Sequence, residues 1–108
     1  MSGPIRDLWA RLGWANSPLR QPTADERPTA GGRYSTFQQG AVFWTAALGS
    51  HAVYGSIYTR YVSVGAATSR LGFPTSDEYA VIGGRATSSQ HGKITWNAAT
   101  GKTTVTYR

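Results

Sequence analysis

The sequence repeats itself with a period of 52 residues. Shifting the chain by that period places residues 5–54 on residues 57–106 without a gap, and 19 of the 50 aligned positions are then identical. Self-similarity at a fixed period indicates copies of one structural unit, and a unit of ~50 residues buries too little apolar surface to be stable alone. We therefore expect one domain over residues 1–108, in which repeat 1 (5–56) packs on repeat 2 (57–108) with pseudo-twofold symmetry.

Each repeat opens with apolar residues spaced along one face of a helix, and Gly13 or Gly65 stands where that helix would end. Later glycines mark turns between short segments of strand composition. The predicted fold class is α+β, with a short helix followed by a three-stranded antiparallel β-meander in each repeat. The helical stripes are Ile5, Leu8, Trp9 and Leu12 in repeat 1, and Ile57, Tyr61 and Val64 in repeat 2. The predicted strands are residues 33–38, 41–45 and 52–54, with counterparts at 85–90, 93–97 and 103–107.

Composition and charge exclude several classes of protein. Hydrophobic residues make up 40% of the chain and charged residues 15%, which is too apolar for a disordered chain. The lack of cysteine excludes a disulfide framework, a thiolate zinc site and a cysteine nucleophile. No apolar run approaches the ~20 residues of a membrane-spanning helix. The net charge of +6 attracts polyanions, but Lys and Arg are scattered singly, which argues against a nucleic-acid site and favours a role in solubility.

Each repeat carries an Asp-Glu pair shortly after a proline. The patterns Thr23-x-x-Glu26 and Thr75-x-x-Glu78 have the spacing of a capping box, in which a hydroxyl and a carboxylate satisfy backbone N–H groups. The alternative is a pair of hydrolytic carboxylates, but adjacent residues rarely place two carboxylates across one substrate. We therefore expect a structural role for these residues. They are Pro22, Asp25 and Glu26 in repeat 1, and Pro74, Asp77 and Glu78 in repeat 2.

An arginine follows seven residues after the glutamate in each repeat, as Arg33 and Arg85. An ion pair that closes the loop would explain why both repeats keep the two residues. The alternative is a guanidinium that forks onto a sugar phosphate or carboxylate. The second interpretation makes both arginines candidate glycan-binding residues.

Aromatic residues must supply much of the core or else line a binding surface. Trp44 and Trp96 share a strand face with Val42 and Ile94, and both repeats keep this face apolar, so we assign the two tryptophans to the core. Aromatic residues found in only one repeat are better candidates for stacking on sugar rings. The preferred candidates are Tyr34, Phe43 and Phe73, from a wider set that also contains Trp14, Tyr54 and Tyr58.

The sequence offers no support for catalysis. His51 and His91 stand at non-equivalent positions of the two repeats, so a repeated metal or acid–base site is not expected. No nucleophile elbow, zinc-protease motif or phosphate-binding loop occurs. We expect no enzymatic activity, no metal and no cofactor.

The segment Leu71-Gly72-Phe73-Pro74 is the tetrapeptide for which the LGFP repeat family is named, and the chain resembles that family along nearly its whole length. Repeat 1 has Leu19-Arg20-Gln21-Pro22 in place of this tetrapeptide, and repeat 2 has Ser88-Ser89-Gln90-His91-Gly92 where Phe-Gln-x-Gly is usual. The other segments that carry the resemblance are Gly31-Gly32-Arg33, Phe37-Gln38-Gln39-Gly40, Trp44 and Val53-Tyr54-Gly55-Ser56-Ile57.

The resemblance implies a non-catalytic module of the envelope of mycolate-bearing actinobacteria and of the phages that infect them. The expected function is glycan binding that attaches a carrier protein to the mycolyl-arabinogalactan-peptidoglycan envelope, with wall polysaccharide as partner and a cell-envelope or extracellular location. The alternative is a structural or decoration protein on the surface of an actinobacteriophage virion, with capsid or tail proteins as partners. The lack of a signal-peptide pattern after Met1 favours this alternative. Because arrays of such repeats are usually longer, we also expect a homo-oligomer.

Overall fold

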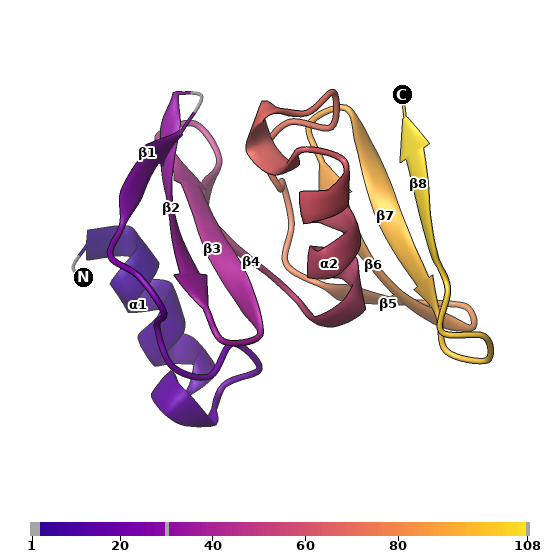
Figure 1. The fold of residues 1–108 in the computed structure, drawn as a ribbon, viewed down its shortest axis with the longest axis horizontal. Coiled ribbons are helices and arrows are strands. Elements are labelled where there is room, and N and C mark those ends of the chain that lie inside the picture. The colour runs from indigo at the N-terminus through magenta and orange to yellow at the C-terminus, as the bar shows by residue number, and fades with distance from the viewer. Residues whose placement is uncertain (1–2, 30, 108) are drawn as a thin grey trace.

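The computed structural model describes residues 3–29 and 31–107. Helices and sheets alternate as four layers: helix α1, a first sheet (sheet A), helix α2, and a second sheet (sheet B) (Figure 1). Repeat 1 contains α1 (Gly3–Leu12), a 3-10 turn (Trp14–Asn16), β1 (Arg27–Thr29), β2 (Gly32–Phe37), β3 (Gly40–Thr45) and β4 (Gly49–Tyr54). Repeat 2 contains α2 (Gly55–Ser63), a 3-10 turn (Ala66–Thr68), β5 (Tyr79–Val81), β6 (Gly84–Ser89), β7 (Gly92–Asn97) and β8 (Thr103–Tyr107).

The α+β class is confirmed, but each sheet has four antiparallel strands and not three. The additional strands, β1 and β5, pair with β2 and β6 at one edge of each sheet. The glycine pairs were expected to lead into the first strand, whereas they turn the chain between the first two strands. Arg27-Pro28-Thr29 has no strand periodicity of its own, and it becomes a strand because β2 offers it a free edge.

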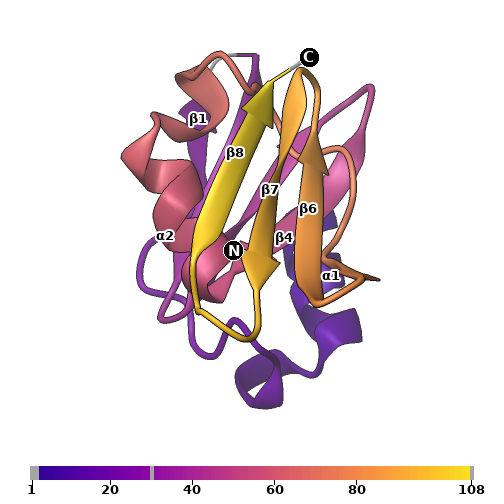
Figure 2. The ribbon, with the colours of Figure 1, turned by 90° about the vertical axis from the view of Figure 1, so that its right-hand side faces the viewer.

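The two repeats stack head to tail, and the expected pseudo-twofold relation is wrong. Helix α1 packs on β3 and β4 from one side of sheet A, while α2 packs on the same two strands from the other side and also on β7 and β8 of sheet B. A twofold axis would require α1 to contact sheet B as α2 contacts sheet A. In the described part of the chain α1 instead packs on its own sheet, so one repeat follows the other as in a solenoid (Figures 1 and 2).

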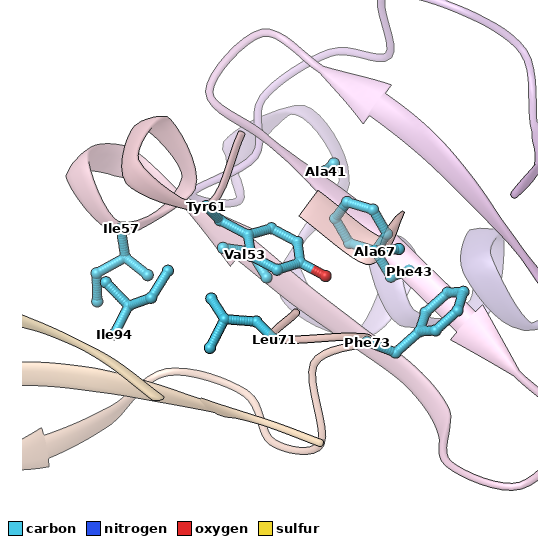
Figure 3. Packing of buried hydrophobic residues seen from close by; sticks show 9 residues of the cluster. All are labelled: Ala41, Phe43, Val53, Ile57, Tyr61, Ala67, Leu71, Phe73 and Ile94. Atoms are coloured by element: carbon cyan, nitrogen blue, oxygen red, sulfur yellow. The ribbon is translucent and has the colours of Figure 1, made fainter. Parts of the chain in front are cut away.

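Two apolar clusters hold these layers together. The first lies between α1 and sheet A, and the second lies around α2 and joins the two sheets (Figure 3). In the second cluster the Tyr61 hydroxyl donates a 2.6 Å hydrogen bond to the carbonyl oxygen of Gly72. At the equivalent place in repeat 1, the Trp9 indole donates a 2.9 Å hydrogen bond to the carbonyl oxygen of Arg20. In both repeats, an aromatic side chain of the helix therefore donates a hydrogen bond to the same loop.

The last strands of the two repeats are offset by one residue. Val42 pairs with Ala52 in sheet A, but its counterpart Ile94 pairs with Val105 in sheet B. Val105 is thus the structural equivalent of Ala52 and not of Val53, with which the ungapped alignment matches it. The β7–β8 turn is one residue longer than the β3–β4 turn, and register is set by which side chains face the core.

Candidate functional site

A surface cleft of about 340 Å³ opens between sheet A and the segment of α2 and the following 3-10 turn. We call it the tyrosine cleft. Tyr34 and Phe43 reach it from sheet A, and Tyr58 and Val62 reach it from α2. The remaining lining residues are Thr29, Thr36, Gly65, Ala66, Ala67 and Thr68. The cleft exists because α2 covers sheet A only in part, so it is a product of the contact between the repeats.

Local geometry brings the two tyrosines to this place. Tyr34 lies opposite Phe43 across β2 and β3, and the two rings stack with centroids 5.7 Å apart and planes 15° from parallel. Tyr58 lies in the first turn of α2, one turn before Val62, so both side chains lie on the same helix face. Gly65, with φ of 110°, ends the helix and returns the chain toward sheet A.

The tyrosine cleft is uncharged and carries hydroxyl groups. Burial raises the pKa of the Tyr58 phenol, and the neighbouring Tyr34 side chain adds to the shift, so the Tyr58 phenol stays neutral at physiological pH. Neither phenol forms a hydrogen bond with another residue of the described ranges 3–29 and 31–107. Aromatic faces beside free hydroxyl groups suit a ligand that has both C–H faces and hydroxyls, which is the chemistry of a neutral sugar.

Of the three aromatic residues preferred as sugar contacts, only Tyr34 lies partly exposed in a cleft. Phe43 is 4% exposed and Phe73 is 5% exposed, and both belong to the cluster around α2 (Figure 3). Their ring faces are occupied by protein, so they are core residues, contrary to the expectation. Tyr58, which the sequence placed only in the wider set, is the second partly exposed aromatic residue of the cleft.

The two arginines form the loop-closing ion pairs. The Arg33 guanidinium bonds to the Glu26 carboxylate, and the Arg85 Nε donates to a Glu78 carboxylate oxygen at 3.0 Å. Both arginine side chains remain 43% exposed. The ion-pair interpretation therefore describes the structure, and a role in glycan binding is confined to the guanidinium nitrogens that the glutamate does not occupy.

The Glu78–Arg85 pair also borders a second cleft, of about 220 Å³, beside Tyr54 and Trp96. Trp96 lies opposite Arg85 in the sheet and is half-buried against the core. Burial raises the pKa of the Tyr54 phenol, and the Glu78 carboxylate raises it further. Trp44 holds the corresponding half-buried position against the core of repeat 1, as expected for both tryptophans.

The prolines and acidic residues lie in the loop that precedes the sheet of each repeat, where the prolines pair with the sheet. Pro22 and Pro74 form single antiparallel bridges with Phe37 and Ser89. The capping-box geometry is absent from the described loop of repeat 1, where the Thr23 hydroxyl bonds at 2.8 Å to the hydroxyl of Thr36.

Asp77 joins the two repeats. Its carboxylate accepts a 3.3 Å hydrogen bond from the backbone N–H of Ala52 and lies 3.3 Å from the His51 ring. Its repeat 1 counterpart, Asp25, is exposed.

The described residues hold no group of three or more His, Cys, Asp or Glu side chains that could bind a metal ion. Neither described helix has the length and apolar character needed to cross a bilayer.

A stack of helix and sheet layers with a neutral aromatic cleft at the junction defines a tandem α+β repeat protein. The chain belongs to the LGFP repeat family, whose model matches residues 20–69 and 71–108. Each matched segment begins in the loop that precedes its sheet. The first matched segment, 20–69, also contains α2, so the family model groups α2 with sheet A. The expected boundaries, 5–56 and 57–108, place α2 with sheet B; α2 contacts both sheets. A comparison with curated proteins finds no match.

Proposed function

We propose that this LGFP repeat protein is a non-catalytic module that binds neutral polysaccharide of the actinobacterial cell wall and thereby attaches its carrier to the envelope. The observation that carries the proposal is the tyrosine cleft, in which the Tyr34 and Tyr58 phenols lie beside threonine hydroxyls with no charged lining residue. Family membership supports the choice of ligand, because the family resemblance points to the arabinogalactan–peptidoglycan wall.

The chemistry of the tyrosine cleft fits binding and not turnover. A sugar ring can stack its C–H face on a phenol ring, while its hydroxyls exchange hydrogen bonds with the two phenols. The Thr36 hydroxyl, which accepts from Thr23, can donate to the sugar, and the Thr68 hydroxyl, which donates to the Gly65 carbonyl oxygen, can accept from it. The lining has no carboxylate pair and no histidine to move protons during glycosidic cleavage. The bound polymer would therefore leave the cleft unchanged.

The test is co-sedimentation of the whole chain with purified mycolyl-arabinogalactan-peptidoglycan. Tyr58→Ala removes one stacking face and is expected to weaken binding about two- to tenfold, since an aromatic contact contributes about 0.5–1.5 kcal/mol. Tyr107→Ala is the matched control, because Tyr107 is an exposed tyrosine on β8 that does not line the tyrosine cleft. This variant should bind like the unaltered chain.

Salt separates this proposal from adsorption through the net charge of +6. Binding in a neutral cleft should persist at high ionic strength, whereas charge-driven adsorption is screened there. A wild-type chain that stays in the supernatant at low salt, or that is released by salt alone, would refute the proposal. Equal binding by Tyr58→Ala and Tyr107→Ala would show that the tyrosine cleft is not the binding site.

A further inference from the structure

One edge of sheet B differs in chemistry from the same edge of sheet A. In sheet A the edge strand β1 is Arg27-Pro28-Thr29, and in sheet B the edge strand β5 is Tyr79-Ala80-Val81. All three residues of β5 are exposed, Tyr79 to 37% and Val81 to 36%, and the next residue, Ile82, is fully exposed. β1 thus carries a charge and a proline, and β5 carries neither. Charges and prolines are the usual means of protecting an edge strand from pairing.

Among residues 3–29 and 31–107, no backbone group pairs with Ala80 on the outer side of β5, so this side can accept another strand. Pro28 occupies the equivalent place in β1, opposite Arg33, as Ala80 lies opposite Arg85. Proline has no N–H, and within a sheet it is tolerated at an edge where the N–H position faces away from the neighbouring strand. Successive residues of an antiparallel strand direct their backbone groups to alternate sides. The N–H and C=O of Ala80 therefore point outward from β6.

We infer that β5 pairs antiparallel with β5 of a second copy of this chain, about a twofold axis centred on Ala80. In this register the two Ala80 residues exchange both backbone hydrogen bonds. Tyr79 of each copy then lies opposite Val81 of the other, an aromatic and β-branched pair of the kind that stabilises antiparallel sheets. The two B sheets become one continuous sheet of eight strands, since each contributes four.

A second copy is favoured as the occupant because the strand is self-complementary and its own three residues carry no charge. An antiparallel pair of identical strands presents the same groups on both sides, which is the requirement for an isologous interface. Glu78, which precedes β5, is paired with Arg85, so the nearest opposite charges compensate each other. The net charge of +6 opposes the approach of two copies, and this repulsion is screened by salt. The dimer should therefore be weak at low ionic strength and stronger at high ionic strength.

The experiment is sedimentation equilibrium of the full chain over a concentration series, at low and high salt. The unaltered chain should show a monomer–dimer equilibrium that shifts toward dimer as salt increases. Ala80→Pro should abolish the dimer and leave the thermal midpoint close to that of the unaltered chain, because Pro28 is accommodated at the same place in repeat 1. Val81→Lys, which places a charge on the edge without altering the backbone, should also give a monomer.

Hydrogen exchange gives an independent readout. The Ala80 amide should exchange more slowly in concentrated than in dilute samples. A chain that is monomeric at every concentration and salt level would overturn the inference. Dimers that persist in both variants would also overturn it, because the interface would then lie elsewhere. Val81→Lys keeps the test decisive even if Ala80→Pro disturbs folding.

Discussion

Replacing Phe43 with alanine should destabilise the protein, because its side chain is part of the core around α2. Phe43 is 4% exposed, and its ring contacts three others: Tyr34 at 5.7 Å, Tyr61 at 5.2 Å and Phe73 at 6.4 Å between centroids. Truncating a buried phenylalanine costs about 3–5 kcal/mol. Loss of the ring pairs places the expected cost for Phe43→Ala at about 4 kcal/mol, a large part of the ~5–15 kcal/mol that stabilises a domain.

Urea unfolding followed by tryptophan fluorescence measures this cost. A loss of about 4 kcal/mol lowers the unfolding midpoint by about 2 M in a domain of this size. Thr95→Ala is the matched control, since Thr95 holds the place of Phe43 in sheet B, and its cost should stay below about 1 kcal/mol. If Phe43→Ala unfolds within 1 kcal/mol of the unaltered chain but loses wall binding, Phe43 is a surface residue and its assignment to the core is wrong.

Two further predictions concern charge and pH. Glu78→Gln should lower the free energy of unfolding by about 1 kcal/mol or less, because the Arg85 side chain is 43% exposed and water screens the pair from that side, while the Glu78 side chain is 15% exposed. A much larger loss in urea unfolding would mean that the pair is effectively buried. Burial raises the pKa of Tyr54, Tyr58 and Tyr61, so above pH ~10 the folded chain keeps phenol protons that the unfolded chain has released. The free energy of unfolding should therefore fall as pH rises above that value, and the decrease should be smaller in Tyr61→Phe. A urea unfolding midpoint that is constant from pH 8 to 11 would contradict the raised pKa values of these buried phenols.

The prediction of helices and turns succeeded because it depends on local patterns. The stripe from Ile5 to Leu12 needs only the period of a helix, and Gly13 and Gly65 do take up positive φ where the helices end. Strand β1 was missed because its pairing is not local. Nothing within Arg27-Pro28-Thr29 indicates a strand, and only the free edge of β2 makes it one.

The candidate site was only partly predictable from the sequence. The assignment of unshared aromatic residues to the surface assumes that the two repeats have the same surroundings. Sheet A is instead covered on both sides, while the outer face of sheet B is turned away from the rest of the molecule (Figure 2). Phe43 therefore belongs to a core face whose counterpart in sheet B carries Thr95. A signal for this was present, because the run from Ala41 to Trp44 is continuously apolar, as in strands buried on both faces.

The duplication and the α+β class follow from the sequence alone, because each depends on local patterns or on residues that both repeats keep. The loop ion pairs were one of two interpretations of Arg33 and Arg85, and the structure decided between them. The order of the layers, the burial of Phe43 and Phe73 and the meeting of Tyr34 with Tyr58 were decided by the tertiary structure. Their common cause is the position of α2, which packs between the sheets. Two similar repeats thereby acquire different neighbours, and a side chain's surroundings depend on which layer its repeat occupies.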